Sequence, residues 1–136
     1  MKGSYVLVLE LERDTEIMVG KLGTLAFKKG HYVYVGSALN GLDHRLQRHL
    51  RDEKRFHWHI DYLLAHASIT EIFFREGNTR EECAIAQQFA SLLPSIPHFG
   101  CSDCSCESHL FFGTCGAIQG CIDFLKMSSY VVTETT

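Results

Sequence analysis

The side chains of this sequence that best suit phosphate chemistry are two tyrosines, an arginine, a histidine and a glutamate. They are Tyr5, Tyr34, Arg45, His49 and Glu82. A guanidinium group matches a phosphate as a fork, and an imidazole can move a proton near neutral pH. A carboxylate can hold one Mg²⁺ or Mn²⁺ while waters complete the coordination shell. These residue types predict chemistry at a phosphate, provided that the fold brings them together.

Each of these side chains also has a purely structural interpretation. Tyrosines are common in strands, where they pack in the core and hydrogen-bond through the hydroxyl. Arg45 and His49 are four residues apart on one side of a helix, and a charged helix face is usually just solvated. Glu82 follows Thr79 by three residues, which is the spacing of a capping box at a helix start. The residue types alone therefore leave both interpretations open.

Basic and aromatic residues concentrate in the middle of the chain. Between Asp43 and Arg55 there are five Lys/Arg and three acidic residues, although the formal net charge of the whole chain is -3. That net charge is unlike an obligate nucleic-acid binder, but the local field at a site matters more than the total. Trp58 either packs on the core or stacks on a base. The candidate DNA-contacting residues are Arg48, Arg51, Lys54, Arg55, His57, Trp58 and His59.

A cluster of thiols and an imidazole follows in the segment 98–110. Cys101, Cys104, Cys106 and His109 form the pattern Cys-x2-Cys-x-Cys-x2-His. Thiolate and imidazole groups are zinc ligands, so a structural Zn²⁺ is one interpretation and a reduced Cys-rich turn is the other. The N-terminus lacks the form of a signal peptide, and no run of eighteen apolar residues is present. We therefore expect reduced thiols, no membrane span and a cytoplasmic location.

The pattern of apolar residues predicts the elements that must position these groups. Residues 4–9 are apolar, as in a central strand that is covered on both faces. Residues 31–35 alternate, with tyrosines on one face and valines on the other, and Gly36 is predicted to end this strand. Residues 24–27 are predicted to form a hairpin with this strand. Further strands are predicted at 16–19, 69–75 and 110–112, and helices at 42–51, 57–66, 79–93 and 117–127.

Several motifs occur in the order found in a known nuclease superfamily. Gly3-Ser4-Tyr5 and Tyr34-Val35-Gly36 resemble the two halves of a GIY-YIG signature, and Arg45, His49 and Glu82 then follow in the expected order. The chain is more similar to the small Uri-type branch of that superfamily. The features that carry this resemblance, between about residues 3 and 112, are Tyr32-Val33-Tyr34-Val35-Gly36-Ser37-Ala38, His57-Trp58-His59-Ile60-Asp61-Tyr62-Leu63-Leu64, Glu82-Cys83, and Phe99-Gly100 with Ser102-Asp103-Cys104-x-Cys106-x-Ser108-His109-Leu110.

The resemblance implies a fold and a division of the chain. The expected fold class is α/β (α+β), a single compact domain with a small central antiparallel sheet flanked by helices. Residues 1–112 would form the nuclease-like domain, with the Cys/His-rich loop at 98–110. Residues 113–136 would form a C-terminal extension with a short helix and a frayed tail.

The resemblance also implies an activity, a metal-dependent endonuclease that hydrolyses phosphodiester bonds in DNA, including branched or damaged DNA, for repair or processing. Glu82 would hold Mg²⁺ or Mn²⁺, and Arg45 would stabilise the transition state. Tyr5 or Tyr34 would take a proton from the attacking water, with His49 as relay. The alternatives are a non-catalytic nucleic-acid-binding module and a zinc-stabilised interaction domain. The oligomeric state is not predicted.

Overall fold

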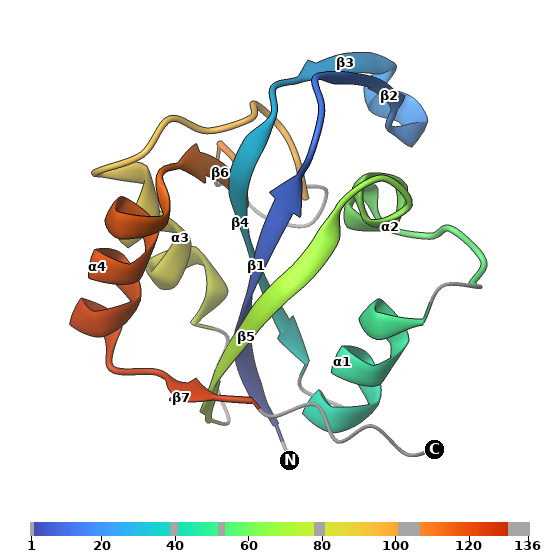
Figure 1. Cartoon of the computed structure of the whole chain (residues 1–136). Helices are drawn as coiled ribbons and strands as arrows, with labels where there is room; N and C mark the ends of the chain where they lie inside the picture. Colours follow the sequence, from blue (N-terminus) through green and yellow to red (C-terminus); the bar gives the residue numbers. More distant parts are fainter. Residues whose placement is uncertain (1, 39–40, 52–53, 78–80, 101–106, 131–136) are drawn as a thin grey trace.

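A computed structural model describes residues 2–38, 41–51, 54–77, 81–100 and 107–130. In these ranges an antiparallel five-stranded sheet, in the order β6-β4-β1-β5-β7, is flanked by helices on both faces (Figure 1). The predicted single α+β domain with a central antiparallel sheet is therefore confirmed. None of the described helices is long and apolar enough to cross a membrane. The elements are β1 (Gly3–Leu11), β2 (Thr15–Met18), η1 (Gly20–Leu22), β3 (Thr24–Phe27), β4 (Gly30–Ala38), α1 (Leu42–Leu50), α2 (His59–Leu64), β5 (Ser68–Glu76), α3 (Glu82–Ala90), β6 (Leu110–Gly113), α4 (Cys115–Leu125) and β7 (Ser128–Ser129).

The two central strands, β1 and β4, pair along their whole length. Their register runs from Gly3 opposite Ala38 to Leu11 opposite Gly30. β1 is paired on its other side with β5, so it is the middle strand of the sheet, as its apolar run predicted. The prediction that the strand ends at Gly36 is wrong. β4 continues to Ala38 because the first residues of β1 supply hydrogen-bonding partners beyond the glycine.

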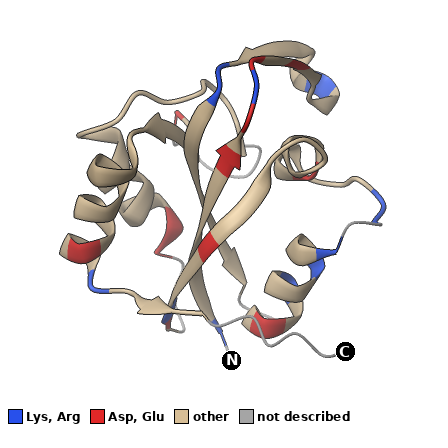
Figure 2. Ribbon diagram, in the orientation of Figure 1, with Lys and Arg blue, Asp and Glu red and all other residues tan. Residues whose placement is uncertain are grey.

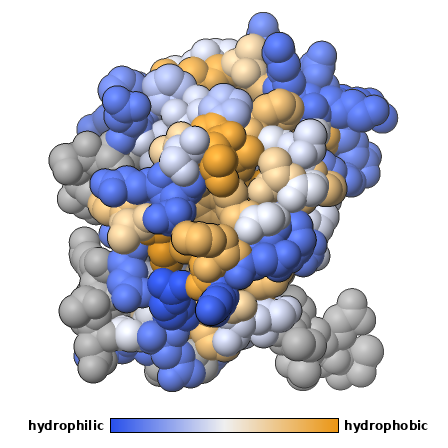
Figure 3. All heavy atoms as spheres, turned by 90° about the vertical axis from the view of Figure 1, so that its left-hand side faces the viewer, coloured by the Kyte–Doolittle hydropathy of each residue, from blue (hydrophilic) through white to orange (hydrophobic). Residues whose placement is uncertain are grey.

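The sheet has two chemically different faces. The aromatic face carries Tyr5, Tyr32 and Tyr34 and is covered by α1 and α2, whose leucines and isoleucine pack against it. The aliphatic face carries valines of the same two strands and is covered by α3 and α4. Figure 3 views the molecule from the side of α3 and α4, where hydrophobic residues lie between hydrophilic ones. The predicted alternation of tyrosines and valines in β4 is thus confirmed.

The predicted hairpin between residues 24–27 and 31–35 does not form. β3 pairs with β2 in a separate two-stranded sheet, and β4 pairs with β1 and β6. The turn that decides this is η1, where Gly20 and Gly23 have positive φ angles of 47° and 80°. Glycine adopts such angles without a Cβ clash, so the chain reverses there and β2 and β3 become neighbours.

The segment after residue 112 packs on the same sheet as the rest of the chain. α4 forms close to the predicted range of 117–127 and buries Ile118, Cys121 and Ile122 in the aliphatic core. β7 then adds to the edge of the sheet beside β5. Residues 115–129 therefore complete the core instead of extending from it. Of the frayed tail expected after the predicted helix, Ser128 and Ser129 instead form β7, and residues 131–136 lie outside the described residues.

Candidate active site

The chemically suited side chains meet at one end of the sheet. Here β1 begins and β4 ends, because the strands are antiparallel, and Tyr5 lies opposite Gly36 in their register. α1 and α3 both begin after strands that end at this side, β4 and β5. Tyr34 lies two residues before Gly36 on β4, and the centroids of the Tyr5 and Tyr34 rings are 6.5 Å apart. The sequence motifs at the two strand ends thus become spatial neighbours.

A hydrogen bond joins the first tyrosine to the histidine of α1. The Tyr5 hydroxyl and His49 Nε2 are 2.6 Å apart, and both side chains are buried. The ring of His49 also packs against Tyr34, with centroids 6.4 Å apart. His49 Nδ1 is buried and has no hydrogen-bond partner among the described residues. Tyr5 and His49 therefore form a buried hydrogen-bonded pair within the site.

Gly36 makes this arrangement sterically feasible. A Cβ at this position would lie 2.5 Å from Cζ and from the hydroxyl oxygen of Tyr5. The Tyr5 ring therefore lies directly across β4, where only hydrogen can face it. The glycine of Tyr34-Val35-Gly36 thus allows the phenol of Tyr5 to approach the backbone of β4 closely.

The arginine of the site is fixed by contacts at both sides. Arg45 Nη1 donates to the carbonyl oxygen of Ser37, at the end of β4, over 2.9 Å. Its guanidinium group lies over the Trp58 ring, 4.5 Å from the centroid. A cation over an aromatic face is attracted by the negative face of the ring. Arg45 therefore has a defined position beside Tyr5 and does not extend freely into solvent.

Glu82 joins the group from α3, on the other side of the sheet. Its negative charge acts on both tyrosines and on His109. The predicted capping box is not formed by this glutamate, because α3 begins at Glu82 and the N-cap residue is Glu81. Thr79 lies outside the described residues. Without that structural role, the half-buried Glu82 carboxylate is available for a ligand.

Burial dominates the electrostatics of the site. It raises the pKa of Tyr5 and of Tyr34 well above the ordinary value, while the Arg45 guanidinium opposes this rise at both phenols. Burial also lowers the pKa of His49 to about 3, although the Asp61 carboxylate acts against this shift. At neutral pH the two phenols are protonated and His49 is neutral. In the tautomer that is protonated at Nδ1, neutral His49 can accept the hydrogen bond from the Tyr5 hydroxyl, while its lowered pKa makes it a weak base.

Glu82 is the residue of the site that could hold the Mg²⁺ or Mn²⁺ that was predicted for chemistry at a phosphate. Glu82 offers a hard carboxylate oxygen, and no group of three His, Cys, Asp or Glu side chains among the described residues could form a metal cage. Mg²⁺ is commonly held by one or two carboxylates and keeps several waters. The residues therefore fit a hydrated Mg²⁺ or Mn²⁺ held by Glu82.

The predicted DNA-contacting residues divide into two groups. Arg48 forms a two-pronged salt bridge with the fully buried Asp61, with N···O distances of 3.0 and 2.9 Å, and also lies over Trp58. His59 Nδ1 accepts a hydrogen bond from the Gly100 amide. These contacts tie Arg48, Trp58 and His59 to the fold. Asp61 was not among the predicted site residues, although it belongs to the motif at residues 57–64. Its position three residues after the N-cap residue Trp58 is the spacing of a capping box.

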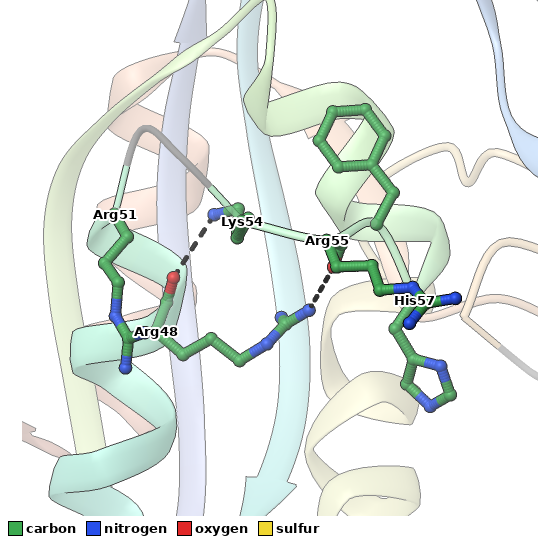
Figure 4. A pocket seen from close by; sticks show the side chains of 6 residues that line it. Arg48, Arg51, Lys54, Arg55 and His57 are labelled. Atoms are coloured by element: carbon green, nitrogen blue, oxygen red, sulfur yellow. Dashed lines mark hydrogen bonds between the residues drawn. The ribbon is translucent and has the colours of Figure 1, made fainter.

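The remaining basic residues lie around an open pocket after α1. The pocket has a volume of about 580 Å³. Figure 2 shows the concentration of Lys and Arg at the end of α1 and in the segment that follows. In Figure 4, Arg48 reaches across the pocket to the backbone of Arg55, and Lys54 donates back to α1. The lining residues are Arg48, Arg51, Lys54, Arg55, Phe56 and His57.

The proposed zinc ligands can be placed only in part. Cys101, Cys104 and Cys106 lie outside the described residues. His109 is buried, and its Nε2 lies 3.8 Å from the Sγ atom of Cys83 in α3. The structure therefore brings one further thiol to His109, a neighbour that sequence spacing did not suggest.

The comparison with known proteins identifies a family. The family described as "Domain of unknown function DUF123" matches residues 4–128, which include every described element of the core. No curated protein and no solved structure matches the chain significantly. Because the match spans nearly the whole sequence and both cores, the chain belongs to the DUF123 family of domains.

Proposed function

We propose that this protein is a divalent-metal-dependent DNA endonuclease of the GIY-YIG superfamily, in its small Uri-type branch, acting in DNA repair or processing in the cytoplasm. The observation that carries the proposal is the 2.6 Å hydrogen bond between the Tyr5 hydroxyl and His49 Nε2. The charges of Arg45 and Glu82 act on the same phenol. A phenol from β1, a guanidinium and an imidazole from α1, and a carboxylate from α3 thus surround the same site.

The proton transfer follows from this hydrogen bond. In the proposed step a water attacks the phosphorus atom and gives its proton to the Tyr5 oxygen, while the phenolic proton passes to His49 Nε2. A free phenolate would be too costly at this buried position, because the pKa of Tyr5 is raised. Moving both protons together avoids the phenolate and forms an imidazolium at His49 instead. Because burial lowers the pKa of His49, this cation needs the negative charge of the bound phosphate beside it. Tyr34, whose hydroxyl has no hydrogen bond to a described residue, then orients the phosphate or the water.

The other two groups act on charge. Arg45 is held by Ser37 and Trp58 in a fixed position, so it can stabilise the charge that develops on the phosphate without reorganising. Glu82 would hold Mg²⁺ or Mn²⁺. When bound, such an ion neutralises the scissile phosphate and helps the leaving oxygen to depart.

The test is a cleavage assay with labelled duplex, single-stranded and branched DNA in Mg²⁺ or Mn²⁺. The variants are Glu82→Gln and the matched control Glu81→Gln, whose carboxylate pairs with Arg75 at 3.5 Å outside the site. We expect cleavage by the wild type and by Glu81→Gln, and loss of cleavage by about 10²–10³-fold in Glu82→Gln. If the wild type binds DNA but cleaves no substrate, the protein is instead the non-catalytic binding module.

Metal analysis under reducing conditions tests the zinc-stabilised alternative separately. A stoichiometric Zn²⁺ in purified protein would support a structural zinc involving His109. Its absence would remove that alternative without affecting the nuclease proposal.

A further inference from the structure

The basic pocket after α1 contains an aromatic ring that the protein core does not use. Phe56 is 43% exposed, although a buried phenylalanine would be expected to favour folding. Its ring contacts Tyr62 edge to face, with centroids 5.0 Å apart. Tyr62 of α2 therefore packs against one side of the Phe56 ring, while much of the ring surface stays open to a ligand.

Two cations beside this ring are not used by the fold. Arg51 and Arg55 are exposed and line the pocket, and neither guanidinium group has a hydrogen bond or ion pair with the described residues. Arg48, in contrast, is held by Asp61 and by the carbonyl oxygen of Arg55. Arg48 therefore forms a fixed side of the pocket, whereas the guanidinium groups of Arg51 and Arg55 can turn toward an anion.

The combination of ring and cations selects among anionic ligands. Cations alone would attract any polyanion, including the backbone of duplex DNA. An aromatic side chain adds affinity only for a planar group with an uncovered face, and the bases of a duplex are already stacked. A volume of about 580 Å³ lies within the usual range for one small ligand, about 300–1,000 Å³.

We propose that this pocket binds an unpaired nucleotide, whose base stacks on Phe56 and whose phosphate is neutralised by Arg51 and Arg55. The proposal rests on the proposed nuclease function and names its substrate class, DNA with a single-stranded segment beside the cleaved bond. The pocket adjoins the candidate active site through Arg48 and Trp58, and the Trp58 and His49 ring centroids are 5.8 Å apart. A strand leaving the Tyr5–His49 pair can therefore continue across Trp58 into the pocket.

The experiment measures binding by fluorescence anisotropy in EDTA, so that it does not depend on turnover. The probes are a labelled single strand, a blunt duplex of the same sequence and the duplex with a single-stranded overhang. The variants are Phe56→Ala, Phe56→Tyr and the matched control Phe124→Ala, which removes an exposed phenylalanine of α4.

We expect Phe56→Ala to weaken binding of the single strand and the overhang by about tenfold, the usual effect of losing one stacked base. Binding of the blunt duplex should change by less than about twofold. Phe56→Tyr should restore binding, and Phe124→Ala should have no effect. Replacing Arg51 and Arg55 by glutamine should reduce the salt dependence of single-strand binding, by a slope of about 1.4 for two phosphate contacts.

Several outcomes would overturn the proposal. They are single-strand affinity unchanged in Phe56→Ala, equal losses for single strand and duplex, or displacement of the strand by a poly-glutamate peptide of the same charge. If single-strand preference is present but no DNA is cleaved in Mg²⁺, the nuclease proposal fails and the pocket stands. If DNA is cleaved and Phe56→Ala has no effect, only the pocket fails.

Discussion

The two faces of one sheet illustrate how the same strands can serve both stability and chemistry. On the aliphatic face, Val33 and Val35 of β4 pack under α3 and α4 without any polar partner. On the aromatic face, the alternate residues Tyr32 and Tyr34 carry hydroxyl groups under α1 and α2. Both sets of residues belong to the same strand and are buried, so the two faces differ only in the chemistry of their side chains. Leaving a buried hydroxyl without a partner costs free energy, so most buried hydroxyls are hydrogen-bonded. The chemical nature of the partner then decides whether the hydroxyl can take part in a reaction.

Within the aromatic face, the tyrosines also differ. The Tyr32 hydroxyl donates to the carbonyl oxygen of Lys28, a backbone partner that cannot accept a proton for chemistry. The Tyr5 hydroxyl instead pairs with His49, a side chain that can. Two buried phenols on one surface therefore have different roles, and the partner atom decides which role each has.

The largest expected effect separates these two tyrosines. Tyr5→Phe should lower the cleavage rate by about 10²–10⁴-fold, because it removes the group that takes the proton from water. Tyr32→Phe should leave the rate nearly unchanged, since its hydroxyl is bonded only to Lys28. Single-turnover cleavage rates and melting curves of both variants test this. Equal cleavage rates in the two variants would show that Tyr5 and Tyr32 do not have different roles.

A second prediction concerns the aliphatic face alone. Ile118→Ala on α4 should lower the free energy of unfolding by about 2–5 kcal/mol, because it leaves a cavity in the core. Cleavage by the folded fraction should be unaffected, since Ile118 packs on the face opposite Tyr5. Urea denaturation and the cleavage rate measure the two effects. The milder Ile118→Val serves if the alanine variant does not fold. A fall in the rate per folded molecule would contradict the separation of the two faces.

The third prediction is a dependence of stability on pH that originates on the aromatic face. Burial lowers the pKa of His49 from 6.5 to about 3 in the folded protein, so the unfolded chain binds a proton at higher pH. The stabilising contribution is therefore complete above pH 6.5 and is lost as the pH falls toward 3. Between pH 7 and pH 4.5 this loss should reach about 2–3 kcal/mol.

Three other groups have shifted pKa values, and the pH range in which each one affects stability distinguishes the histidines from Asp61. Burial lowers the pKa of His59 and of His109, so these residues contribute in the same direction as His49. Burial opposes the fall in the pKa of Asp61, but hydrogen bonds from Arg48 and two backbone amides outweigh it, so Asp61 loses its contribution only below about pH 3.8. His49→Gln should therefore reduce the pH dependence above pH 4.5. An unchanged dependence would exclude His49 as its main source.

The smallest expected effect concerns the support of the site. Arg48→Lys keeps the positive charge but loses the two-pronged contact with Asp61. We expect stability to fall by about 1.5 kcal/mol, the value of one hydrogen bond to a charged group. The matched control is Arg51→Lys, at an exposed position, which should be nearly neutral. Chemical denaturation measures both variants, and equal values would show that the Asp61 contact contributes little.

The sequence carried most of the information on the central sheet. The apolar run of residues 4–9 and the alternation of residues 31–35 predicted a central strand and a two-faced strand, because period and burial are encoded locally. The hairpin was assigned to the wrong pair of strands. β3 pairs with β2 across the η1 turn, and β4 pairs with β1 instead of β3. The β1–β4 pairing connects residues that are 19 to 35 positions apart, so no local pattern predicts it.

For the candidate site, the sequence determined the chemistry that is available, namely phenol, guanidinium, imidazole and carboxylate at Tyr5, Arg45, His49 and Glu82. Only the tertiary structure decided which of these groups touch. Antiparallel pairing placed Tyr5 across from Gly36, and packing of α1 placed His49 against the Tyr5 hydroxyl. Packing also bound Arg48 to the buried Asp61 and left Phe56 exposed. Partner choice depends on contacts between distant segments, which no local pattern of residues specifies.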